Sequence, residues 1–190
     1  MILPVTAYGH PVLKKVAEEI DKDYPQLDEL ISDMWDTMYH TVGVGLAAPQ
    51  INRSIRLFVI DATPYEDEIP DVKEKKKVFF NAKMIEEEGE EWFFSEGCLS
   101  IPKINEDVSR KKRVHIQYYD ENWEFRDEWY DGVFARIIQH EYDHIQGIVF
   151  VDRLSSMKRT LLRRKLSDII NGRVDVDYKM IFQKSRKGKK

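Results

Sequence analysis

Two histidines and a glutamate on one predicted helix have the types and spacing of a hydrolytic metal site. Residues 136–147 read RIIQHEYDHIQG, which places His140 and His144 four positions apart and Glu141 directly after the first. Positions four apart share one face of a helix, so both imidazoles can bind one ion. In this HExxH pattern the metal lowers the pKa of a water molecule and the glutamate takes its proton.

The same pattern has a structural interpretation. Five-residue patterns recur by chance, and histidines on helices often only pack or form hydrogen bonds. Ile137, Ile138 and Ile145 supply core positions around the two histidines. HExxH alone therefore leaves both interpretations open.

A third protein ligand is needed, because catalytic metal sites commonly use three and keep one position open. No histidine follows His144, so the extended HExxHxxGxxH pattern of some peptidases is absent. Cys98, the single cysteine, stands upstream beside Gly97, a residue that permits a tight turn. A thiolate is a strong ligand for a borderline metal, whereas a lone cysteine is otherwise usually a small buried hydrophobe.

Hydrophobic periodicity predicts the elements that position these residues. An apolar stripe at helical spacing predicts a helix over residues 26–39, and further helices are predicted over about 132–146 and 155–170. Strands are predicted over 55–61, 78–85, 113–119 and 124–130, with one more short strand within 174–182. Residues 90–100 start strand-like and are predicted to turn at Gly97. Strands dominate the first two thirds and helices flank them, which indicates an α+β fold. We expect antiparallel sheets packed around the HExxH helix, with an N-terminal and a C-terminal helix.

Composition favours a cytoplasmic globular protein. The chain has 190 residues, 34% of them charged, and a net charge of -4, which argues against specific DNA binding. No apolar run approaches a membrane span, and the N-terminus does not resemble a signal or transit peptide. A single cysteine excludes an intrachain disulfide and fits a reducing compartment. The charged segment 62–77 is predicted to be an exposed loop.

Three stretches together resemble the peptide deformylase family of bacterial type. They are GVGLAAPQ at 43–50, EGCLS at 96–100 and QHEYDH at 139–144, which match the family motifs GxGxAAxQ, EGCxS and HExxH in order. The resemblance covers about residues 1–170. It implies a hydrolase that removes the formyl group from N-formylmethionine at the start of new polypeptides and releases formate.

The resemblance also implies the roles of the chemical groups. Cys98, His140 and His144 would bind one divalent ion, ordinarily Fe²⁺, which Zn²⁺, Ni²⁺ or Co²⁺ can replace. Glu141 would act as general base and then as general acid. The side-chain amide of Gln50 and the backbone N–H of Leu99 would stabilise the oxyanion.

The substrate-binding residues are implied in the same way. Those expected to line the methionine pocket are Val44, Phe94, Val133, Ile137 and the ring of His140. Those expected near the substrate backbone or the cysteine turn are Gly43, Gly45, Glu96 and Gly97. Arg136 is expected to cover the pocket edge with its aliphatic stem while its charged head stays in water. Glu96 is expected to pair with Arg110, although a surface role for Arg110 within RKKR is the alternative.

The C-terminal part of the chain is strongly basic. We expect residues 1–170 to form a single catalytic domain and residues 171–190 to form an extension whose basic tail is disordered. In part of the family a C-terminal helix docks on the ribosome, so charge-driven ribosome contact is one hypothesis. A solvated helix with a solubilising tail is the other.

Two other functions compete with deformylation. A zinc endopeptidase would share HExxH but lacks its usual third ligand here. A ribosome-associated homologue without catalysis would be expected to lose Glu141 or Gln50, and both are present.

Overall fold

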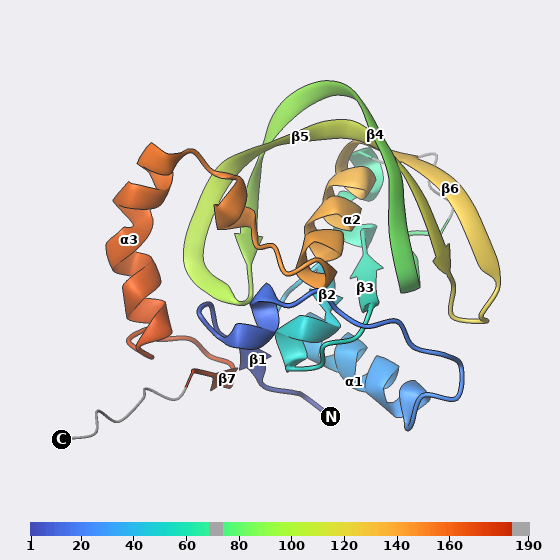
Figure 1. The fold of residues 1–190 in the computed structure, drawn as a ribbon, viewed down its shortest axis with the longest axis horizontal. Helices are drawn as coiled ribbons and strands as arrows, with labels where there is room; N and C mark the ends of the chain where they lie inside the picture. Colours follow the sequence, from blue (N-terminus) through green and yellow to red (C-terminus); the bar gives the residue numbers. More distant parts are fainter. Residues whose placement is uncertain (69–73, 184–190) are drawn as a thin grey trace.

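The computed structural model describes residues 1–68 and 74–183 and shows a mixed fold of helices and antiparallel strands (Figure 1). The α-helices are α1 (Leu27–His40), α2 (Gly132–Ile145) and α3 (Ser156–Ile170). The strands are β1 (Val5–Thr6), β2 (Gly45–Ala47), β3 (Leu57–Asp61), β4 (Lys76–Cys98), β5 (Ile101–Tyr119), β6 (Phe125–Asp131) and β7 (Met180–Ile181). Short 3₁₀ turns are η1 (Pro11–Lys14), η2 (Ala48–Ile51), η3 (Thr63–Glu68) and η4 (Phe150–Arg153). The predicted α+β class is confirmed.

The main sheet has the order β2-β3-β4-β5-β6, and every neighbouring pair in it is antiparallel. The strands predicted over 113–119 and 124–130 pair with each other as parts of β5 and β6. The strand predicted over 78–85 and the strand-like start of 90–100 belong to one continuous strand, β4, whose pairing with β5 is interrupted by register shifts. The turn predicted at Gly97 comes later, at residues 99–100, because β4 runs on through Cys98. Such bulges bend a strand, and in Figure 1 β4 and β5 arch over α2. The arch brings the end of β4 back toward the helix.

Helix α2 is buried over most of its surface, because it packs against β2, β3, β5 and β6. Phe134 and Ile138 are fully buried in a cluster with Phe58 and Phe79 of the sheet. Burying a large apolar side chain contributes roughly 1.5–3 kcal/mol, so this cluster fixes the helix against the sheet. The core interpretation of the isoleucines around the histidines is correct, and it coexists with the cluster of ligands described below.

Helices α1 and α3 each bury one face. The helix predicted over 26–39 is α1, which buries Met34 and Met38 against the first strands of the sheet. The helix predicted over 155–170 is α3, and Ser155 caps it by accepting a hydrogen bond from the N–H of Lys158. No helix of the described residues is long and apolar enough to cross a membrane.

The C-terminal segment returns to the N-terminus, where β7 pairs in parallel with β1. The strand predicted within 174–182 is confirmed only at Met180–Ile181. The predicted loop 62–77 is partly ordered, since η3 occupies Thr63–Glu68 and β4 begins at Lys76, and the side chain of Tyr65 is half-buried. Residues 69–73 of that loop and the predicted disordered tail 184–190 lie outside the described residues.

Candidate metal centre and active site

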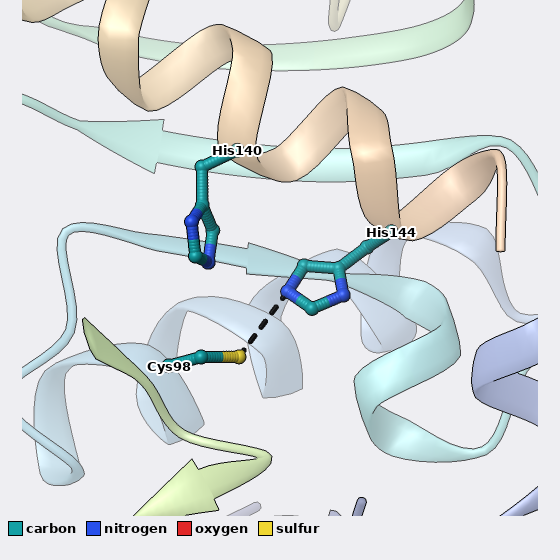
Figure 2. A group of neighbouring side chains, drawn as sticks. All are labelled: Cys98, His140 and His144. Atoms are coloured by element: carbon teal, nitrogen blue, oxygen red, sulfur yellow. Dashed lines mark hydrogen bonds between the residues drawn. The ribbon is translucent and has the colours of Figure 1, made fainter. Parts of the chain in front are cut away.

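Cys98, His140 and His144 converge at one point, as Figure 2 shows. Both histidines come from the same face of α2, and the cysteine comes from the end of β4. The potential ligand atoms of the three residues all lie within 4.8 Å of one another, and Cys98 Sγ lies 3.3 Å from His144 Nε2. One thiol and two imidazoles form a donor set suited to a transition metal.

A tight turn at the end of β4 presents the cysteine. Cys98 pairs with Ile101, so the chain reverses over Leu99 and Ser100. Outside the sheet ladder, the carbonyl of Ser100 accepts a hydrogen bond of 2.8 Å from the N–H of Tyr8. The carbonyl of Leu99 accepts one of 2.8 Å from the hydroxyl of Tyr178. The turn is therefore held by the main sheet and by both ends of the chain.

Glu96 orients the first histidine. Its Oε2 lies 2.9 Å from His140 Nδ1, which leaves the other ring nitrogen for a ligand. Arg110 donates two hydrogen bonds to the same carboxylate, at 2.7 and 2.9 Å. Burial by itself would raise the pKa of Glu96, but the hydrogen bonds from Arg110 and His140 outweigh it and hold the pKa well below its usual range. The expected Glu96–Arg110 ion pair is present, and the surface alternative for Arg110 is wrong because the residue is only 3% exposed.

Arg136 differs from its expectation. Its side chain is buried, so the prediction of a guanidinium in water is wrong. The head donates to Glu96 Oε1 at 2.9 Å and to the carbonyl of Trp92 at 2.7 Å, and it lies over the Trp92 ring. A buried guanidinium is tolerated only with such partners, and they lie on β4, far away in sequence.

A second carboxylate extends this network. Asp143, which has no firm assignment from the sequence, accepts a hydrogen bond of 2.7 Å from Arg110 and is also paired with Arg153. Arg153 follows α2 in the η4 turn, and no local pattern pointed to it. Arg110 and Arg153, with the carboxylates of Glu96 and Asp143, thus brace α2 against β4 and β5.

Glu141 is a buried carboxylate beside the ligand cluster. It is 4% exposed, and its Oε2 has no hydrogen-bond partner among the described residues. Burial raises the pKa of Glu141 to about 7. A carboxyl group with a near-neutral pKa can both accept and return a proton, which is what acid–base chemistry requires.

Gln50 and Leu99 lie on the other sides of the cysteine. Gln50 is buried, and its Oε1 accepts a hydrogen bond of 2.8 Å from the N–H of Ala47. This bond directs the amide nitrogen toward Cys98, with Nε2 3.4 Å from Sγ. Leu99 follows the cysteine directly and lines the cavity described next.

A cavity of about 770 Å³ opens in front of these groups. Of the expected substrate-binding residues, those that line it are Gly43, Val44, Gly45, Phe94, Glu96, Gly97, Arg136 and Ile137, together with His140. Val133 is not among the lining residues and packs in the core cluster instead, a full helical turn before Ile137. The wall also includes Tyr65, Lys103, Asn105 and the segment 175–178, which are not among the residues expected from the sequence.

Of these additional residues, Tyr65 had some signal in the sequence, being an aromatic residue in an otherwise charged loop. Its ring lies 6.3 Å from that of Phe94 in an edge-on contact. The segment 175–178 had none, because its place in the wall depends on the pairing of β7 with β1.

Comparison with known proteins identifies the family of this chain. The family model described as polypeptide deformylase matches residues 2–160. The peptide deformylase of Christiangramia forsetii is 57% identical over the full length of both chains, and that of Flavobacterium psychrophilum is 52% identical over 95% of this chain and 96% of its own. A crystal structure of a peptide deformylase from Legionella pneumophila superimposes with a TM-score of 0.77 at 37% identity, over 91% of this chain and 98% of that one. A peptide deformylase from Plasmodium falciparum gives 0.79 at 34% identity, over 88% and 95%. This chain belongs to the polypeptide deformylase family.

Proposed function

We propose that this protein hydrolyses the formyl amide of N-formylmethionine at the start of newly made polypeptides and releases formate. The observation that carries the proposal is the buried carboxylate of Glu141, which lines the same cavity as Cys98 and His140 and whose Oε2 has no hydrogen-bond partner among the described residues. Cys98 and His140 in turn converge with His144. Family membership supports it independently. Relatives that match over their whole length carry the name peptide deformylase.

Cys98, His140 and His144 would hold one divalent ion. The residues fit such an ion, because His140 Nδ1 is engaged by Glu96 and the second ring nitrogen is left for coordination. We propose Fe²⁺ in the cell, with Zn²⁺, Ni²⁺ or Co²⁺ able to replace it. The bound ion would supply Lewis acidity, which lowers the pKa of water and polarises the formyl oxygen.

The chain's own residues would move the proton and stabilise the charge. Glu141 takes the proton from the attacking water and returns it to the departing amine, a role that suits its pKa of about 7. The amide nitrogen of Gln50 and the N–H of Leu99 donate to the formyl oxygen as negative charge grows there. Each such donor contributes about 3 kcal/mol to the transition state.

The cavity would bind the methionine side chain and the peptide that follows it. Val44, Phe94 and Ile137, with the ring of His140, form the apolar part, and Val133 supports Ile137 from the core. Gly43 and Gly45 let the substrate backbone approach, because neither has a side chain that would fill the space. Arg136 shapes the wall through its bonds to Glu96, and Gly97 permits the close packing of β4 on Asn105.

Formate release from a formyl-Met tripeptide by the anaerobic Fe²⁺ protein tests this function. Glu141→Gln and Cys98→Ser are expected to abolish most of the activity, whereas Glu90→Gln, a carboxylate exposed on β4, serves as matched control. If the wild type is no faster than Glu141→Gln, the protein is not a deformylase. Cleavage of an unformylated internal peptide bond instead would favour the endopeptidase alternative, which no family match supports.

We propose that residues 1–170 form the catalytic domain, with residues 171–190 as an extension, and that the protein acts in the cytoplasm, where polypeptides are made.

We also propose that α3 contacts the ribosome. Arg159, Arg163, Arg164 and Lys165 are exposed on it, beside Met157 and Leu161, while Leu162, Leu166 and Ile169 are buried in the core. Deleting α3 would uncover that core, so surface substitutions are the better test.

A further inference from the structure

The segment that follows α3 returns to the cavity and completes its wall. Asp175, Val176, Asp177 and Tyr178 line the cavity on the side of the cysteine turn. The family match ends at residue 160, so this wall lies beyond the part of the chain that the family model describes. What the segment contributes is therefore a question for the structure.

The segment is fixed at both of its ends. The carbonyls of Lys179 and Ile181 accept hydrogen bonds of 2.8 Å from the N–H groups of Val5 and Ala7. Val174, Met180 and Phe182 pack against the buried cluster beneath α3. Tyr178 thus lies in a bend just before β7, in a segment that is anchored on both sides.

The hydroxyl of Tyr178 reaches the cysteine turn. It donates a hydrogen bond of 2.8 Å to the carbonyl of Leu99, the residue whose N–H is a proposed oxyanion donor. Burial raises the pKa of Tyr178 to about 12, so the hydroxyl keeps its proton at neutral pH and remains a donor. The N–H and the carbonyl of one residue are separated only by φ and ψ. Fixing the carbonyl of Leu99 therefore restricts the direction in which its N–H points.

We infer that Tyr178 is a positioning residue for the reaction. By holding the carbonyl of Leu99, it restricts the backbone of that residue so that its N–H is preorganised toward the formyl oxygen. This inference rests on the proposed function. Preorganised donors act on the transition state more than on the ground state, so the effect belongs to kcat. The C-terminal segment is on this account part of the active site.

Tyr178→Phe in the full-length protein tests the inference, because it removes one hydroxyl and keeps the ring. We expect kcat to fall about tenfold with KM nearly unchanged, since complete loss of an oxyanion donor costs about 10²- to 10³-fold and here the donor is only loosened. Hydrogen–deuterium exchange gives a readout independent of activity. It is expected to become faster over residues 98–100 in the variant.

Tyr39→Phe is the matched control. It also removes a tyrosine hydroxyl bond, of 2.7 Å to Asp61, but it lies on α1 and does not line the cavity. It should leave kcat and the exchange of residues 98–100 unchanged.

Wild-type kcat in Tyr178→Phe would overturn the inference while leaving the proposed function intact. Equal losses in both variants, or loss of the metal from Tyr178→Phe, would also overturn it, because the effect would then be general destabilisation or an action on Cys98. A wild-type protein that releases no formate would overturn both proposals.

Discussion

The carboxylate of Glu141 packs directly against the backbone of Gly45. A Cβ atom built on Gly45 would lie 2.7 Å from Glu141 Cδ, closer than real side chains approach. The glutamate comes from α2 and the glycine from β2, so the contact spans the helix–sheet interface. The absence of a side chain at position 45 thus leaves room for the proposed general base, besides any approach of substrate.

Gly45→Ala is therefore expected to displace Glu141 and to lower kcat by about 10²-fold, within the range that loss of a general base produces. Gly43→Ala is the comparison, because a Cβ there would meet its neighbours at 3.4 Å, an ordinary contact. Its loss of kcat should be much smaller, because a Cβ at position 43 does not meet Glu141, and any obstruction of the substrate backbone there would raise KM instead. Steady-state formate release from both variants measures the difference, and equal losses would contradict a steric effect on Glu141.

Glu96→Gln is expected to lower the free energy of unfolding by about 3–5 kcal/mol at pH 7, because it leaves two buried arginines short of a partner. Urea denaturation measures the loss. Glu90→Gln, on the same strand but exposed, should stay within about 0.5 kcal/mol of wild type.

The stability gained from Glu96 should depend on pH in one direction. The pKa of Glu96 in the folded protein lies below its ordinary value of 4.5, so folding is stabilised by its ionised form. The difference between wild type and Glu96→Gln should be constant from neutral pH down to about 5. It should then shrink progressively as the pH falls below 4.5. A difference that grows on acidification would show that the sign of the pKa shift is wrong.

Metal content should follow the three converging side chains. The wild type is expected to bind about one divalent ion per chain, and Cys98→Ala, His140→Ala and His144→Ala should each bring the content toward zero. His115→Ala is the control, since His115 lies on β5 and pairs with Asp127. Full metal content in any of the three ligand variants, measured by elemental analysis after dialysis, would remove that residue from the site.

The Fe²⁺ form should lose activity in air faster than under anaerobic conditions, because oxygen oxidises either the iron or the thiolate of Cys98. The Ni²⁺ form is the control for iron oxidation and should decay more slowly in air. Time courses of formate release measure the decay. Identical aerobic and anaerobic decay of the Fe²⁺ form would contradict the prediction.

Ribosome contact through α3 should be electrostatic. Changing Arg163, Arg164 and Lys165 to glutamate is expected to weaken co-sedimentation with ribosomes and to flatten its dependence on salt. The apolar residues that anchor α3 to the core are untouched by these changes, so formate release should remain.

The same change of net charge on other faces is the control for that experiment. Lys15, Lys22 and Lys112 are exposed and lie outside α3. Their replacement by glutamate should affect binding less. Equal weakening by both sets would indicate a nonspecific charge effect and would remove α3 as the docking surface.

The sequence by itself determined the local features. Helical periodicity placed α2 and α3 to within a residue or two, and HExxH put His140 and His144 on one face, because positions four apart always share a face. Cys98 was a candidate ligand from its chemistry and from the three-motif resemblance. These inferences needed only neighbours in sequence or fixed motifs.

Only the tertiary structure decided which distant groups meet. Arg136 was expected in water but is buried, because Glu96 and the carbonyl of Trp92 on β4 offer it partners. Tyr178 reaches Leu99 because β7 pairs with β1. The physical reason is common to both: burial of a charge or placement of a hydroxyl depends on partners brought together by bulged strands and long-range pairing, and no local periodicity encodes those.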